Sequence, residues 1–115
     1  MIEVIVTMHA REGKEDELRA FLLTIVVESR QETGNLRYNL LIGDDDPREF
    51  AIHAQWENAA ALNAHLRSKP VGFAHGRMPE LTDVLPRVVA YRSVEPMVKK
   101  HSGPTRRLDP EDSQE

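Results

Sequence analysis

Four segments of the chain have the hydrophobic patterning that is typical of half-buried β-strands. In the first of them, the apolar side chains of Ile2, Val4, Val6 and Met8 alternate with other residues and so fall on one face. The next two segments show the same period of two, and the last is rich in β-branched valine. The predicted strands are residues 2–9, 36–43, 49–57 and 87–94.

Between these strands, the apolar spacing changes to that of helices. Residues 14–32 carry an apolar stripe at helical spacing and acidic residues in the first turn, where the helix dipole favours them. Gly34 is expected to end this helix in a left-handed conformation. Residues 59–67 predict a second helix that is capped by Asn58 and stops before a proline. Residues 71–85 are less regular, and we expect only a short helix there that starts at Pro79.

The order of these elements is β-α-β-β-α-β. Right-handed crossovers fold this order into an α+β, ferredoxin-like plait, which is a four-stranded antiparallel sheet with both helices on one face. The other face is too apolar, taken together, to lie open to water. A second copy of the chain is the simplest cover, so we predict a homodimer packed sheet to sheet. The residues of this second face include Ile5, Thr7, Leu41, Ala51, His53, Val89 and Tyr91.

Composition and charge narrow the class of protein. The chain has 115 residues and a net charge of -4, which suits one domain and offers no basic surface for nucleic acid or for anionic lipid. No apolar run approaches the ~20 residues of a membrane span. Cysteine is absent, which fits a reducing compartment, and we expect a soluble cytoplasmic domain. We expect this domain at residues 1–96 and a disordered or partner-ordered tail at residues 97–115, where apolar residues are scarce.

Candidate chemistry is concentrated around the only tryptophan. Trp56 ends a predicted strand and is either plain core or core that also forms a pocket wall. His65 lies beside the buried stripe of the second helix, as a helix-end hydrogen-bonding group or as a base over a pocket. The five histidines lack the close spacing of a zinc site, and we expect no metal.

Three further residues are candidates for contact with a ligand. His75 and Arg77 lie in the irregular segment, where a lid or a pocket rim is expected. Tyr38 can donate a phenolic hydrogen bond into a cavity, or it can simply pack. No phosphate-binding glycine loop, metalloprotease motif, esterase motif or kinase motif is present in the sequence.

A set of short motifs, in a fixed order, resembles the antibiotic biosynthesis monooxygenase (ABM) family over about residues 2–95. The resemblance implies a ferredoxin-like plait that dimerises into an α+β barrel. Similar domains include quinol monooxygenases that use O2 without a cofactor, haem-degrading enzymes, isomerases of small lactones, and members with no assigned activity. The matching residues are Gly13, Thr33-Gly34-Asn35-Leu36-x-Tyr38, Asp46-Pro47-x-x-Phe50, Gln55-Trp56-Glu57 and Ala61-Leu62-x-x-His65.

The sequence departs from the family pattern at several positions. Many members carry Glu at the position of Ala54 and a second His at that of Pro70. Members that bind a substrate carbonyl through Asn would carry it at Ile52. Haem-degrading relatives have Asn and Trp at the positions of Thr7 and His65, although His75 aligns with their haem ligand. Haem breakdown is therefore disfavoured.

The leading hypothesis is a cofactor-independent monooxygenase that oxidises a small phenolic, quinol or polyketide-like aromatic substrate with O2. His65 would be the proton acceptor and His75 the alternate. Trp56 would form the pocket wall, while Tyr38 and Arg77 would contact substrate oxygens.

Two alternatives belong to other functional classes. A non-catalytic binding or structural dimer would have a pocket that is collapsed or is filled by Phe73, Met78 or Leu62. A small-molecule isomerase would use His65 together with a carboxylate such as Glu57.

Overall fold

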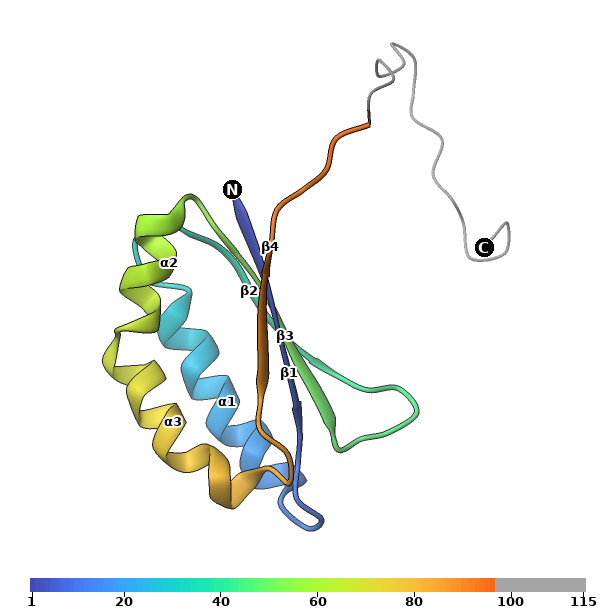
Figure 1. The fold of residues 1–115 in the computed structure, drawn as a ribbon. Helices are drawn as coiled ribbons and strands as arrows, with labels where there is room; N and C mark the ends of the chain where they lie inside the picture. Colours follow the sequence, from blue (N-terminus) through green and yellow to red (C-terminus); the bar gives the residue numbers. More distant parts are fainter. Residues whose placement is uncertain (97–115) are drawn as a thin grey trace.

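The computed structural model describes residues 1–96, and the tail predicted for residues 97–115 lies outside the described residues. Figure 1 shows three helices gathered on one side of a sheet. Within residues 1–96, no helix is both long and apolar enough to cross a membrane. The elements in chain order are β1 (Ile2–His9), α1 (Glu15–Ser29), β2 (Asn35–Ile42), β3 (Glu49–Trp56), α2 (Ala59–Leu66), α3 (Lys69–Leu81) and β4 (Arg87–Tyr91).

The four strands form one antiparallel sheet in the order β2-β3-β1-β4. β1 pairs with β3 from Ile2 opposite Trp56 to His9 opposite Glu49, and its other edge pairs with β4. β2 and β3 are joined by a turn and pair along their whole length, apart from an irregularity near Asn35. This arrangement confirms the predicted α+β, ferredoxin-like fold.

The hydrophobic core lies between the helices and the sheet. In β3 every second residue is buried, from Phe50 to Trp56, because successive side chains of a strand point to opposite faces. The predicted apolar stripe of α1 packs into the same core, and Leu18 is completely buried. The buried faces of β3 and α1 confirm the strand and helix periods from which these elements were predicted.

The prediction of a short helix that starts at Pro79 is wrong. α3 runs continuously from Lys69 to Leu81, and only residues 82–85 of the segment 71–85 are irregular. Pro70 lies in the first turn, where its missing N–H is not needed, and Pro79 lies within the last turn. The glycines and prolines of this segment obscured a buried stripe that does follow helical spacing. Its members are Ala74, Met78 and Leu81.

Gly34 does not end the first helix, as the sequence had suggested, because α1 stops five residues earlier at Ser29. It does adopt a left-handed conformation, with φ +84. Its carbonyl accepts a hydrogen bond of 2.8 Å from the N–H of Glu57, and a Cβ atom at this position would lie 2.5 Å from that of Ala61. The turn before β2 therefore packs directly against the start of α2.

The face of the sheet opposite the helices has a mixed surface. Ile5 and Val89 are half-buried on it, and Leu41 is exposed. Near one end, Glu3 accepts a hydrogen bond of 2.7 Å from His53, and this bond holds the pKa of the Glu3 carboxyl below its ordinary value. The apolar part of this face is the surface on which the predicted sheet-to-sheet dimer depends.

The close approach at Gly34 gives a first prediction. Gly34→Ala introduces both a side chain at positive φ and an overlap with Ala61, whereas Gly13→Ala introduces only the first, since it has φ +85 and no atom near its Cβ position. We expect Gly13→Ala to lower the free energy of unfolding by roughly 1–2 kcal/mol. Gly34→Ala should lower it by a further ~1–3 kcal/mol. Urea denaturation measures both, and equal losses would contradict the packing described for Gly34.

Candidate functional site

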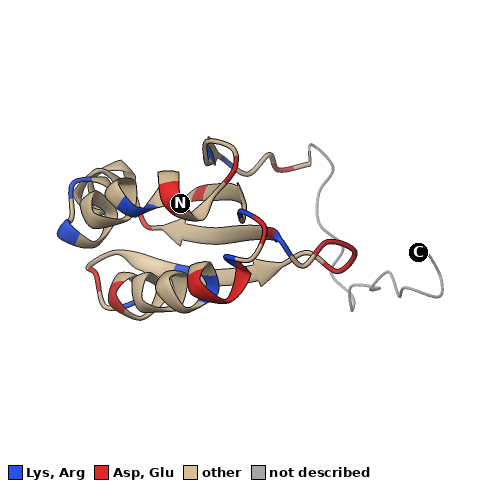
Figure 2. Cartoon of the chain, turned by 90° about the horizontal axis from the view of Figure 1, so that it is seen from below, with Lys and Arg blue, Asp and Glu red and all other residues tan. Residues whose placement is uncertain are grey.

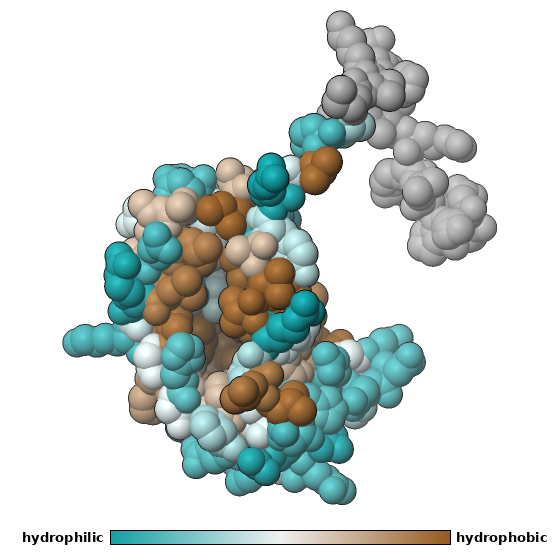
Figure 3. All heavy atoms as spheres, viewed as in Figure 1, coloured by the Kyte–Doolittle hydropathy of each residue, from teal (hydrophilic) through white to brown (hydrophobic). Residues whose placement is uncertain are grey.

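A largely apolar cavity of about 120 Å³ lies between the helices and the sheet. In Figure 3 it is the hollow surrounded by hydrophobic residues, between α2 and α3 on one side and β4 on the other. The sheet contributes aliphatic side chains such as Val4 and Ile52, and α1 contributes Leu22 and Ile25. Most of the wall therefore offers no hydrogen-bond partner to water.

Four of the five residues predicted for the site line this cavity: Tyr38, Trp56, His65 and His75. They come from β2, β3, α2 and α3, so the fold brings together side chains that are far apart in the sequence. His75 differs from the other three because it is exposed and lies at the mouth.

The fifth residue, Arg77, lies outside the cavity. Its guanidinium binds Glu17 of α1 at 2.8 Å and also pairs with Glu80. It packs over the ring of Phe21 at 5.1 Å from the centroid. Arg77 therefore joins α3 to α1, and the structure does not bring it to the other candidates.

The inner end of the cavity is a cluster of three rings. His65 is 6% exposed, and its ring lies 4.6 Å from that of Trp56 and 5.4 Å from that of Tyr38, measured between centroids. The Asn58 side chain accepts a hydrogen bond of 2.9 Å from the N–H of Ala61, which fixes the start of the helix that carries His65. The position of the imidazole is thus set by packing on two sides.

A carboxylate that the sequence analysis missed completes this cluster. Glu32 lies in the turn after α1, and its Oε1 is 2.7 Å from Nδ1 of His65. Nδ1 donates to the carboxylate in this pair, which leaves Nε2 as the nitrogen that can accept a proton. Among the described residues, Nε2 makes no hydrogen bond. Glu57, the carboxylate considered in the isomerase hypothesis, is exposed and does not bond to His65.

The two other rings also carry polar groups. Burial raises the pKa of the Tyr38 phenol above its ordinary value, a hydrogen bond with Ser29 acts in the opposite direction, and the nearby Glu32 carboxylate raises the pKa further, so the phenol is neutral at pH 7. Trp56 is completely buried, and its Nε1–H has no partner within residues 1–96. Buried donors are nearly always paired, so an acceptor inside the cavity would satisfy this N–H.

The comparisons with known proteins agree with this architecture. The family model described as antibiotic biosynthesis monooxygenase (ABM) matches residues 1–77. The chain belongs to the ABM family. A search of curated proteins finds no match.

Solved structures share the ABM fold over most of their length. Protein SO0527 of Shewanella oneidensis is 28% identical, with a TM-score of 0.74 over 78% of this chain and 87% of that one. A provisionally named antibiotic biosynthesis monooxygenase of Deinococcus radiodurans is 26% identical, with a TM-score of 0.78 over 88% of this chain and 100% of that one. Protein PA3566 of Pseudomonas aeruginosa is 26% identical, with a TM-score of 0.74 over 82% and 94%.

Some of the positions at which this chain departs from the ABM pattern lie inside the cavity. Ala54 and Ile52, which stand where many members were expected to carry Glu and Asn, both line it. Pro70 lies in the first turn of α3. In this ABM domain, the polar groups at the inner end are therefore supplied by Tyr38, Trp56 and the pair of His65 with Glu32.

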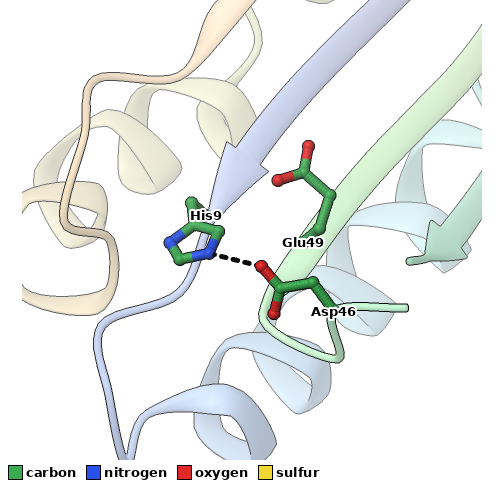
Figure 4. A group of neighbouring side chains, drawn as sticks. All are labelled: His9, Asp46 and Glu49. Atoms are coloured by element: carbon green, nitrogen blue, oxygen red, sulfur yellow. Dashed lines mark hydrogen bonds and ion pairs between the residues drawn. The ribbon is translucent and has the colours of Figure 1, made fainter. Parts of the chain in front are cut away.

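A second cluster of titratable side chains, built around a single histidine, lies at the opposite end of β1. Figure 4 shows His9 there beside Asp46 and Glu49. These three offer atoms within 4.8 Å of one another, a spacing that could hold a metal ion. Both ring nitrogens of His9, however, face carboxylates, Nε2 at 2.9 Å from Asp46 and Nδ1 at 3.0 Å from Asp83. Both nitrogens must be protonated to donate in this way, which favours an ion-pair network over a metal centre.

Charged groups surround this network on every side. Arg48 bonds to Asp83 at 3.0 Å, and the acidic turn that holds Asp46 projects from the sheet in Figure 2. The hydrogen bond to Asp46, with that to Asp83, raises the pKa of His9 above its ordinary value of 6.5. The cluster thereby joins the end of β1 to the β2–β3 turn and to the segment before β4.

The His9 network gives a second prediction. Because the pKa of His9 is raised in the folded state, protonation of His9 stabilises the fold. This stabilisation is fully present below about pH 6.5 and is lost as the pH rises through the pKa of folded His9. Asp46→Asn should lower this pKa, as measured by NMR titration of the imidazole. It should also reduce the decrease in the free energy of unfolding that accompanies the rise in pH. Asp45→Asn, in the same turn but without a hydrogen bond to His9, is the matched control. An unchanged pKa in Asp46→Asn would contradict the network.

Proposed function

We propose that this ABM domain is a monooxygenase that oxidises a small phenolic or quinol substrate with O2 and needs no bound cofactor. The observation that supports it is the pair of Glu32 with His65, held against two aromatic rings at the inner end of an apolar cavity. A base that faces a dry pocket is what the removal of a phenolic proton requires.

The first step is the transfer of the substrate proton to Nε2 of His65. The imidazolium that forms is stabilised by Glu32 through Nδ1, the arrangement that also holds the ring in the tautomer able to accept. The N–H of Trp56 and the phenol of Tyr38 are the donors available to the phenolate oxygen. The charge therefore develops where the cavity offers its polar groups.

The second step uses the electrons of the phenolate. The anion gives one electron to O2, and the resulting phenoxyl radical and superoxide combine at a ring carbon that carries hydrogen. The peroxide takes the proton back from His65, and loss of water leaves a new carbonyl group. One oxygen atom thus enters the product and the other leaves as water, with every electron supplied by the substrate.

The remaining predicted residues take different positions in this proposal. His75 lies at the mouth and stays the alternate proton acceptor. Arg77 is not included as a substrate ligand, because Glu17 and Glu80 hold its guanidinium outside the cavity.

The alternatives differ in what they need from the cavity. A purely structural dimer was expected to have a collapsed or filled pocket, but the cavity is open and Phe73, at 63% exposure, does not fill it. An isomerase would use the same base, His65, without O2. Turnover in the absence of oxygen therefore separates the isomerase from the monooxygenase.

We also propose that two copies of the chain pack through the open sheet faces. The support is the apolar part of that face, where Ile5 and Val89 lie opposite each other on neighbouring strands. A cytoplasmic location stays a prediction from composition.

The role of the histidine pair gives the third prediction. Oxygen uptake should be measured with a panel of quinols and naphthols, for the unmodified chain and for variants. His65→Ala should lower turnover by roughly 10²–10⁴-fold. Glu32→Gln should lower it as well, because an amide can donate to Nδ1 and so favours the tautomer whose Nε2 carries the proton.

Asn63→Ala is the matched control for these variants, since Asn63 is exposed on the same helix and does not line the cavity. It should leave the rate unchanged. A rate in His65→Ala that equals that of the unmodified chain would remove His65 from the mechanism.

The dimer gives the fourth prediction. Light scattering after size exclusion should return about twice the chain mass of 13.1 kDa at micromolar concentration. Ile5→Lys should halve the measured mass, because an unpaired charge cannot be buried between two sheets. Val27→Lys, at a position 58% exposed on α1, should leave the mass unchanged. A mass near 13.1 kDa for the unmodified chain would reject the dimer.

A further inference from the structure

The cavity has a buried polar end and an exposed apolar mouth. Trp56, Tyr38 and His65 are 0%, 5% and 6% exposed, whereas Leu66 and Val88 at the mouth are 47% and 57% exposed. A ligand whose hydroxyl reaches His65 must therefore point the opposite end of its ring outward, toward the open mouth of the hollow seen in Figure 3.

The cavity as a whole has room for about one aromatic ring. Its volume is about 120 Å³. An apolar cavity of about 150 Å³ takes up benzene in a well-packed protein. A fused second ring beside the hydroxyl would have to displace close-packed side chains such as Leu22 or Ile52, and such overpacking is unfavourable.

The lining of the cavity carries no permanent positive charge. Among the described residues, no Lys or Arg borders this cavity, and the nearest carboxylate, Glu32, is held behind His65. A substrate whose carboxylate or phosphate lies inside the cavity would bury that charge without a Lys or Arg partner, which is strongly unfavourable. The inner end therefore suits a neutral hydroxyl that gives its proton to His65.

Beyond the mouth, the cavity continues into an outer groove of about 520 Å³. The two share His75, Met78, Pro86 and Val88, and the groove adds the polar side chains of Arg11, Thr82 and Asp83. A group on the ring carbon opposite the hydroxyl has space there, and His75 can bond to it if it is a second hydroxyl.

From these observations we infer that the substrate is a single-ring phenol or hydroquinone that carries no charge inside the cavity and whose one large substituent lies para to the reacting hydroxyl. The inference rests on the proposed function for the choice of hydroxyl and base. The shape and the charge of the lining define the rest. Ortho-substituted phenols, fused rings such as naphthols, and phenols with a carboxylate beside the hydroxyl are excluded from the inner end of the cavity.

Binding to the unmodified chain tests this inference without turnover. Calorimetry under nitrogen compares 4-propylphenol with its isomer 2-propylphenol, with 1-naphthol and with 2-hydroxybenzoate, whose carboxylate lies beside the hydroxyl. Quenching of Trp56, the only tryptophan, reports whether the ligand enters the cavity. We expect 4-propylphenol to bind at least about tenfold more tightly than each of the other three.

A variant at the mouth distinguishes the effect of the cavity's shape on ligand affinity from the effect of general hydrophobicity. Val88→Phe should narrow the mouth and weaken 4-propylphenol more than phenol itself. Val27→Phe adds the same ring on the outer surface of α1 and should change neither affinity.

Each outcome bears on the inference. Equal or tighter binding of 2-propylphenol, 1-naphthol or 2-hydroxybenzoate would overturn it, as would the absence of binding by every phenol. Tight binding of 4-propylphenol together with no oxygen uptake would uphold the substrate class and reject the monooxygenase. Oxygen uptake with naphthols but not with single-ring quinols would uphold the monooxygenase and reject the single-ring substrate class.

Discussion

The close packing of the turn before β2 against the first turn of α2 is the constraint on which the site depends. Gly34 has no side chain, so Ala61 can approach its backbone, and the N–H of Glu57 bonds to its carbonyl. The same contact holds Glu32, two residues earlier in the turn, within reach of His65 on the helix. A backbone contact therefore helps to hold Glu32 and His65 at the hydrogen-bonding distance on which the proposed function rests.

The site combines an apolar wall with a few polar groups, and each needs the other. In an apolar cavity the hydrogen bond between His65 and Glu32 is stronger than it would be in water, because little solvent competes for it. The same surroundings raise the pKa of Tyr38 and leave the N–H of Trp56 without a partner. The features that favour a buried ligand thus arise from one cause, which is the exclusion of water by the helices.

The two ends of the sheet use histidine in opposite ways. At His9 both ring nitrogens face carboxylates, so the imidazole is held in its protonated form as a structural cation. At His65 a single carboxylate holds one nitrogen, and the other makes no hydrogen bond within residues 1–96. The number of acceptors around the ring distinguishes an ion pair that joins loops from a group that can exchange a proton.

The sequence by itself determined the strands, the first helix and the plait, because burial on one face imposes a period that can be counted along the chain. It did not show α3, whose glycines and prolines mask the helical period, or Arg77 as a link to α1. The partnership of Glu32 with His65 was also hidden, since the two lie 33 residues apart. Local pattern records which face is buried, whereas contacts between distant residues exist only after the helices have packed on the sheet.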